Sequence, residues 1–399
     1  MVKNFRPGLC RTAQPRSRRL KPKCLEFGKA ESFTGLRFPF SSPVYNDEKD
    51  YSLMTQSDTQ VDYMPSPMAK SLRMFAYMAT AIGLLFIFNN FLIFWQGWPG
   101  VNVFLAHYGL PGLDSLPKPL DGTMLTLGWV QFLVYLGAIV GSIFYVLTSP
   151  ARSLLADSER LSFIVAYIIR SAFWAILLVG VVDMVISFMR VEGFLESLFG
   201  LDVAKNLGRA SYRGVYIHYP LIGIGFLISL FTRSLGFTWL ALLIVLAELL
   251  IVITRFVFSY EQAFMGDLVR FWYAGLFLFA SAYTLIEEGH VRVDILYTGF
   301  TERGKAWSNT IGCLILGIPV CWIILIYGMW GKSNLINAPM LSYEVTQNGY
   351  GMFVKYIMAG FLMVYAVSMM IQFIGYFLNN ASVLLNEPGH RPEHDHQNV

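Results

Sequence analysis

The stretch LTLGWVQFLVYLGAIVGSIFYVLT, residues 125–148, carries no charged side chain. A helix needs about 20 predominantly apolar residues to cross the ~30 Å hydrocarbon core of a bilayer, so this stretch is long enough to span a membrane. The whole chain has the same character. Of its 399 residues 55% are hydrophobic and 14% are charged, whereas about a quarter of the residues of a soluble domain are charged. This composition predicts a polytopic membrane protein and excludes a disordered chain or a disulfide-stapled secreted module.

Other runs of similar length predict about eight transmembrane helices in an all-α, polytopic integral membrane protein. The predicted spans are residues 74–95, 125–148, 161–189, 217–232, 235–254, 271–286, 306–331 and 353–378. The run 217–232 is short for a membrane span, and it could be a re-entrant or interfacial segment instead.

Positive charge is concentrated before the first predicted span. Residues 1–69 hold 11 of the 30 Lys and Arg residues and 7 of the 26 Asp and Glu residues. This segment has no periodic apolar face and no apolar core of a signal peptide, so we expect a polar, disordered tail. Basic residues favour the cytoplasmic side of a membrane, which argues for a cytoplasmic N-terminus. The basic residues of the 190–214 loop oppose that orientation.

Apart from Lys355 near the start of the last one, the predicted spans contain three charged residues, namely Arg170, Asp183 and Glu248. A charge in hydrocarbon costs about 3 kcal/mol on insertion scales, so such a side chain normally faces protein or water. Arg170 and Asp183 lie about 20 Å apart along one helix, so Asp183 needs a partner elsewhere and Arg170 could extend to a membrane surface. We interpret Glu248 as a helix–helix contact within the chain or with a partner, and its alternative role is an ion or proton site.

The sequence contains no motif of an enzyme or of a cofactor site. No nucleotide-binding, hydrolase or metalloprotease motif occurs, and the four cysteines show no metal-binding spacing, so we expect no enzyme activity, cofactor or metal. Haem would need histidines facing each other within spans, but His107, His218 and His290 lie at span ends or in loops. The charge distribution also argues against a nucleic-acid partner.

The stretch from Arg255 to Asp294 carries a family resemblance. Arg255 follows one span, a short amphipathic piece covers 260–268, and the next span ends in Glu287-Glu288-Gly289-His290-Val291-Arg292-Val293-Asp294. This pattern resembles the small, Q-type membrane subunit of tripartite ATP-independent periplasmic (TRAP) transporters, in its long form. Two positions depart from the family, because Gly266-Asp267 stands where a Glu pair is common and Ile286 stands where an Arg is common.

The resemblance implies a domain organisation and a set of candidate residues. It implies a four-helix core at 234–380 in the C-terminal half, additional membrane helices at 70–233, and polar tails at 1–69 and 381–399. The residues that it marks for partner docking are Arg255, Asp267, Arg270, Gly289, His290, Arg292 and Asp294.

The resemblance also implies a function in the bacterial inner membrane. Such a subunit scaffolds a large permease subunit, which works with a periplasmic solute-binding protein in the ion-driven symport of a small organic acid or related solute. Membrane lipid is the remaining expected partner. The residues leave two alternatives: a self-sufficient ion-coupled carrier using Glu248 and Asp183, and a membrane anchor for a redox enzyme.

We expect a chain that starts at Met54, and so lacks residues 1–53, to insert into the membrane and assemble as the full chain does. The removed segment has no apolar face to bury and no run long enough to span a bilayer. Quantitative blotting of membrane fractions checks this, and a loss of the inserted protein would contradict it.

Overall fold

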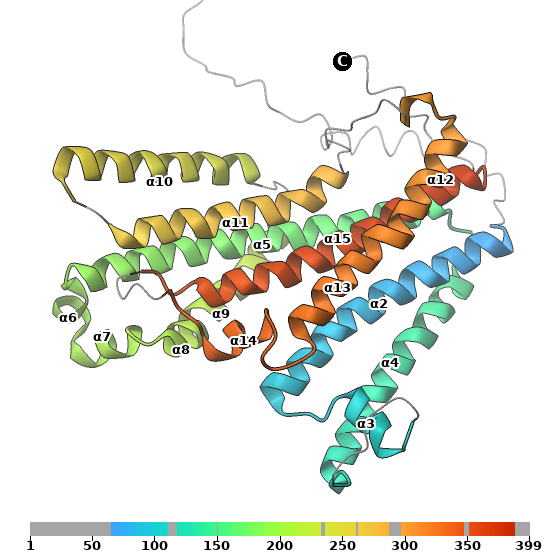
Figure 1. Cartoon of the computed structure of the whole chain (residues 1–399), viewed down its shortest axis with the longest axis horizontal. Coiled ribbons are helices and arrows are strands. Elements are labelled where there is room, and N and C mark those ends of the chain that lie inside the picture. The colour runs from blue at the N-terminus through green and yellow to red at the C-terminus, as the bar shows by residue number, and fades with distance from the viewer. Residues whose placement is uncertain are drawn as a thin grey trace, which may run out of the picture. The chain divides into compact units, whose positions relative to one another are not determined.

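The structure, a computed structural model, describes residues 65–110, 118–149, 151–232, 236–260, 262–286, 297–346 and 351–387. These residues all fall within one packed unit, Val61–Val399. Every regular element among them is a helix (Figure 1). The predicted all-α class is therefore confirmed, while the predicted disorder of the N-terminal tail concerns residues that lie almost entirely outside the described ranges.

Within the described residues, eight helical runs are long and apolar enough to cross a membrane, as predicted. They are α2 (Pro67–Gln96), α4 (Gly122–Thr148), α5 (Leu154–Val191), the run Ala210–Phe231, α10 (Phe237–Phe258), Phe264–Leu285 within α11 (Ala263–Ile286), the run Glu302–Met329, and α15 (Lys355–Leu384). The short helices between them are α3 (Val101–His107), α6 (Phe194–Phe199), α7 (Leu201–Leu207), the 3-10 turn η2 (Tyr297–Gly299) and α14 (Asn337–Ser342).

The fourth span is longer than the sequence predicts. It begins at Ala210 rather than at 217, and runs through α8 (Ala210–Arg213), the π-helical turn η1 (Gly214–His218) and α9 (Tyr219–Phe231). The resulting 22 residues are long enough to cross a membrane, so nothing in its length requires a re-entrant segment. The predicted span begins too late because a charged residue such as Arg213 is expected in a loop rather than in an apolar run.

Two spans contain a π-helical turn directly before a proline. Pro220 follows η1, and Pro319 follows the turn η3 (Cys313–Gly317), which joins α12 (Glu302–Gly312) to α13 (Ile318–Met329). Proline lacks an N–H, and its ring collides with the carbonyl group of the preceding helical turn. A wider π turn changes which carbonyl faces the ring, so each helix continues across its proline.

Helix ends extend beyond the predicted spans where polar groups find partners. The N-terminal parts of α2 and α5 are joined by a buried ion pair between Arg73 and Asp157. Tyr77 also donates a hydrogen bond of 2.8 Å to Asp157.

The amphipathic piece 260–268 is not a separate helix, because α11 is continuous from Ala263. The polar C-terminal tail, predicted from 381, begins later because α15 runs to Leu384.

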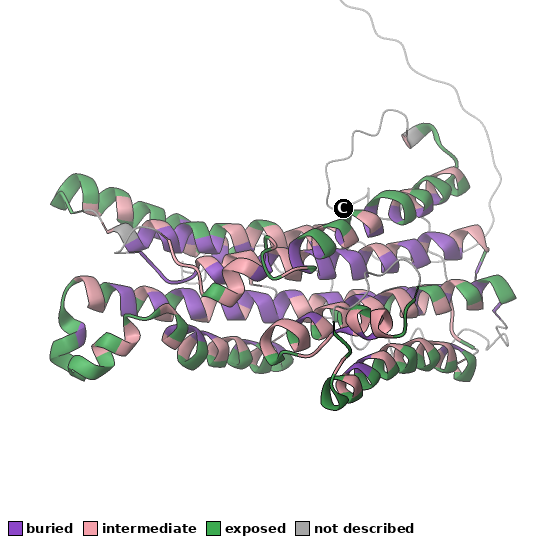
Figure 2. Ribbon diagram, turned by 60° about the horizontal axis from the view of Figure 1, so that its bottom comes forward, coloured by how far each residue is buried: buried purple, intermediate pink, exposed green. Residues whose placement is uncertain are grey.

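The bundle is organised around α5 and α15. These two helices pack against each other, α5 also packs against α9 and α11, and α15 packs against α11, α12, α13 and α2. Buried residues concentrate in the long central helices, whereas the outer helices are largely exposed (Figure 2). Helix α4 packs on α2, and α10 packs on α11. Helix α5 therefore packs against helices on both sides of the predicted boundary at 233/234.

Small residues allow close helix contacts in this bundle. Gly225 of α9 lies so close to α5 that a Cβ atom there would stand 2.7 Å from the backbone nitrogen of Ala175. Beside it, the hydroxyl groups of Ser171 and Ser229 are 2.7 Å apart. Close backbone approach at small residues, together with hydrogen bonds between hydroxyl groups, is typical of helix association in membranes.

We expect Gly225→Ala to destabilise the protein by about 1–3 kcal/mol, because the added methyl group collides with the α5 backbone. Gly223→Ala is the matched control, since a Cβ at Gly223 of the same helix meets no atom within 4 Å. Denaturation of the purified protein in detergent compares the two variants. Equal stability of both would contradict the close α5–α9 contact.

Candidate functional site: a buried charge network at one end of the bundle

Three connections between helices meet at one end of the bundle, which we call the loop end. Tyr260, after α10, donates a hydrogen bond to Glu192, after α5. Arg190 Nη2 donates to the carbonyl oxygen of Gly351 at 2.8 Å, and Met352 N donates to Asp267 of α11 at 3.1 Å. The hydrogen bond to the Glu192 carboxylate raises the pKa of Tyr260, because ionisation would place two negative charges side by side.

Asp183 of α5 is the centre of this end. Its side chain is fully buried, and its Oδ1 atom accepts from Arg213 Nη1 at 2.8 Å. The same oxygen lies 3.1 Å from His218 Nε2, and Oδ2 accepts from the backbone N–H of Phe353 at 2.9 Å. A buried carboxylate needs compensating charge and hydrogen bonds, and three N–H groups from two other segments supply them.

Arg213 links α5 to the segment before α15. Besides Asp183, its guanidinium donates to Ser187 Oγ at 3.1 Å and to the carbonyl oxygen of Leu207 at 2.5 Å. It also lies 4.3 Å from the centre of the Phe353 ring, and Arg190 lies 4.5 Å from the same ring. Two cation–π contacts thus hold Phe353 in place.

His218 and Tyr356 complete the network. The Nδ1 atom of His218 lies 2.7 Å from the Tyr356 hydroxyl group, and its Nε2 atom faces Asp183. A neutral imidazole has one donor and one acceptor. It satisfies both contacts when Nε2 donates to the carboxylate and Nδ1 accepts from the tyrosine. The network then contains one buried anion and one buried cation in direct contact, Asp183 and Arg213.

Asp267, one of the candidates from the resemblance, anchors the same segment from α11. Its buried carboxylate accepts from Met352 N and from Thr346 Oγ1, the latter at 3.2 Å, and it lies 3.5 Å from Arg270 Nη1. Arg270 itself is largely exposed, as is Arg255 at the end of α10. The candidates thus divide into one buried anchor and two cations on the surface of the loop end.

The other candidates are placed differently. Gly289, His290, Arg292 and Asp294 lie outside the described residues. Arg170, which could have extended to a membrane surface, is buried in the bundle, and its Nε atom has no hydrogen-bond partner.

Glu248 is exposed on α10. It makes no hydrogen bond or ion pair with the part of the chain that the structure describes, so the interpretation as a contact within the chain fails there. The interpretation as a contact with a partner stays a prediction.

The network holds segments together rather than presenting reactive groups. Its charges are paired, and no group of three His, Cys, Asp or Glu side chains among the described residues could hold a metal ion. Cys313 and Cys321 are buried free thiols. What the arrangement does physically is to fix residues 351–356 against α5, α8 and α11.

Sequence analysis did not identify Arg213, His218, Phe353 or Tyr356. Asp183 lies inside a predicted span and therefore needs a cationic partner. Arg213, at the border of the next span, is one candidate that the sequence offers. However, Lys205 and Arg209 lie on the same connection, so sequence could not choose among the three cations. The backbone N–H of Phe353 has no sequence signature at all.

The fold and this network define a multi-pass α-helical membrane protein whose helices are linked by buried charges at one end. Residues 241–382, about a third of the chain, match the family model described as tripartite ATP-independent periplasmic transporters, DctQ component. This region therefore resembles the small membrane component of TRAP transporters, and further helices long enough to cross a membrane precede it in the chain. Searches of curated proteins and of solved structures found no match.

We expect Asp183→Leu to destabilise the protein by about 3–5 kcal/mol, because it leaves Arg213 buried without its counter-charge. The double variant Asp183→Leu/Arg213→Leu should lose less than the sum of the two single variants. Denaturation in detergent measures the coupling, with Lys332→Leu as an exposed control. Additive effects of the two single substitutions would contradict the pairing.

Proposed function

We propose that this chain is the small membrane subunit of a TRAP-type secondary transporter. It scaffolds a large permease subunit in the bacterial inner membrane, for ion-gradient-driven uptake of a small organic acid or related solute delivered by a periplasmic binding protein. The single observation that carries the proposal is the match of α10, α11, α12, α13 and most of α15 to the DctQ component. That family is a transporter component rather than an enzyme family, and we assign no catalysis to this chain.

The geometry does not support the alternative of a self-sufficient carrier. Asp183 is fully buried and engaged by Arg213, His218 and Phe353, so its carboxylate is not free for a coupling ion. Glu248 lies on α10, which packs against α11, and its side chain is exposed. A coupling site needs ligands that converge on the ion, and these two carboxylates belong to separate environments.

The exposed face of α10 is the proposed contact with the large subunit. Glu248 sits at the middle of this helix, and its neighbours Val245 and Leu249 are large, apolar and exposed. A carboxylate facing hydrocarbon is costly, by about 3 kcal/mol on insertion scales. A partner helix that offers a hydrogen-bond donor at this depth removes that cost. The apolar neighbours supply the packing surface around it.

The loop end is the proposed contact with the solute-binding protein. With a cytoplasmic N-terminus, the third crossing, α5, ends on the periplasmic side, and Arg255 and Arg270 are exposed at that end. Asp183, Arg213 and Asp267 hold the segment before α15 beside them. Residues Gly289, His290, Arg292 and Asp294, which connect α11 to α12, remain candidate contacts of the large subunit.

The test is co-expression of this chain with the large permease, followed by purification and reconstitution in liposomes. We expect a stable complex whose uptake requires both membrane subunits, the binding protein and an ion gradient. Substrate-dependent, sodium-driven uptake by this chain alone would overturn the proposal in favour of a carrier.

In the same system we expect Glu248→Gln to preserve assembly and the sodium dependence of uptake, because an amide keeps the shape and a hydrogen-bonding oxygen. Glu248→Leu should weaken assembly by about 1–3 kcal/mol, since the donor on the partner is left unpaired. Glu159→Leu, at another exposed position, is the control. A large shift in sodium dependence of Glu248→Gln with assembly intact would identify an ion site instead.

A further inference from the structure

A cavity of about 320 Å³ lies at the loop end, where α5 ends against α6 and α7. Among the residues that line it are Arg190, Gly193, Leu195, Glu196, Leu201 and Lys205. Its volume is at the lower end of the range for small-molecule sites, which suits a ligand group of the size of a phospholipid headgroup.

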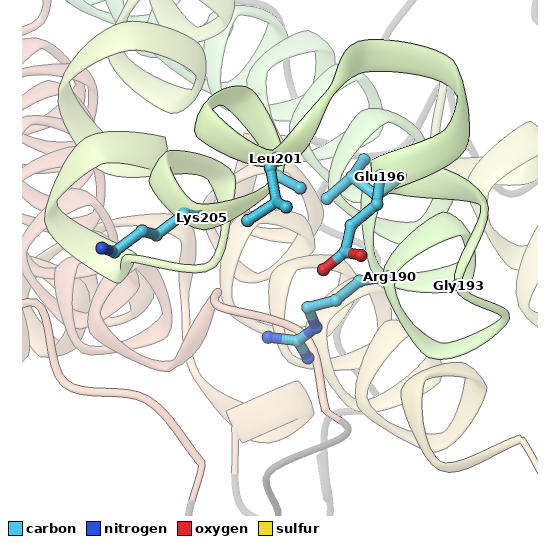
Figure 3. A pocket seen from close by; sticks show the side chains of 7 residues that line it. Arg190, Gly193, Glu196, Leu201 and Lys205 are labelled. Carbon is cyan, nitrogen blue, oxygen red and sulfur yellow. The ribbon is translucent and has the colours of Figure 1, made fainter.

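The lining carries charges of both signs. Arg190 and Lys205 are cationic, and Glu196 is anionic and exposed. Figure 3 shows the side chains of Arg190 and Glu196 pointing toward one another, with Leu201 between Glu196 and Lys205. Arg190 gives one Nη2–H to the carbonyl oxygen of Gly351, and a guanidinium has five N–H donors. Donors for an anionic group and an acceptor for a cationic group therefore line the same cavity.

The surroundings of the cavity are apolar and uncovered. Leu198, Phe199 and Leu201 are 67%, 54% and 70% exposed, although they lie on short helices directly after a membrane span. Leu195 points inward and is buried. Short helices with one apolar face and charged residues on the other lie in the membrane interface, where that face meets the acyl chains. The cavity thus opens beside a surface that suits hydrocarbon.

We propose that this cavity binds the headgroup of a phospholipid with a primary ammonium group, of the phosphoethanolamine type. The phosphate accepts hydrogen bonds from Arg190 and Lys205, the ammonium group donates to Glu196, and the acyl chains lie along Leu198, Phe199 and Leu201. A phosphoglycerol headgroup has no cation for Glu196. A phosphocholine headgroup has a cation without an N–H, so it cannot make the charge-assisted hydrogen bond.

This inference does not depend on the proposed role in transport, and its test needs only the full chain. Native mass spectrometry of the purified protein, titrated with phosphatidylethanolamine, phosphatidylglycerol and phosphatidylcholine of identical acyl chains, measures each affinity. We expect phosphatidylethanolamine to bind about tenfold more tightly than the other two, which corresponds to one charge-assisted hydrogen bond. Equal binding of the three lipids would overturn the proposal.

Two variants assign the selectivity to the cavity. Glu196→Gln should abolish the preference for phosphatidylethanolamine over phosphatidylglycerol, and Asp202→Asn is its control, because it makes the same change of charge on α7 outside the residues that line the cavity. Lys205→Gln should weaken the binding of both lipids, with the exposed Lys332→Gln as control. Unchanged selectivity in Glu196→Gln would overturn the proposal.

A competition experiment separates a lipid from a soluble ligand with the same headgroup. Soluble phosphoethanolamine at millimolar concentration should displace little bound lipid, because it lacks the acyl chains that pack on α6 and α7. Complete displacement would mean that the cavity is a site for a free zwitterion, and the lipid proposal would then be wrong.

Discussion

The pairing of Asp183 with Arg213 is the interaction on which the loop end of this protein depends. An uncompensated charge inside a bundle is costly, and each of these two side chains is fully buried. Because they meet at 2.8 Å, the charge on Arg213 does not end the fourth span, and the helical run can begin at Ala210. The second carboxylate oxygen then accepts from Phe353 N, which positions the chain just before α15.

Through these contacts the N-terminal helices pack together with the region that matches the DctQ component. Helix α5 lies outside the matched region, yet it packs against α11 and α15, which lie inside it. The segment 351–356 receives Asp183, Arg190 and Arg213 from the N-terminal helices and Asp267 from the matched region itself. The extra helices therefore do more than add membrane anchors, because they supply most of the polar contacts of this segment.

Charged side chains inside the bundle and on its outer surface lie in different environments. Inside the bundle, Arg73 pairs with Asp157 and Arg213 pairs with Asp183. On the outside, α10 exposes an apolar surface interrupted by Glu248. An isolated carboxylate on a lipid-facing helix is unfavourable unless another molecule covers it. This contrast separates the residues that build the subunit from those available to a partner.

Much of this fold followed from composition and from the length of apolar runs. Eight spans and the all-α class were predictable, because hydrocarbon forces every spanning segment to be long, apolar and internally hydrogen-bonded. The resemblance of the C-terminal half to the small TRAP component was also visible in the sequence, and residues 241–382 match that family. Sequence also indicated that Asp183 needed a partner, which the structure supplies in Arg213. It could not choose Arg213 over neighbouring cations, or see that a backbone N–H at Phe353 would face Asp183. Those choices depend on how α5, α9 and α15 pack in three dimensions, since a buried charge is neutralised by whatever the tertiary structure brings within hydrogen-bonding distance.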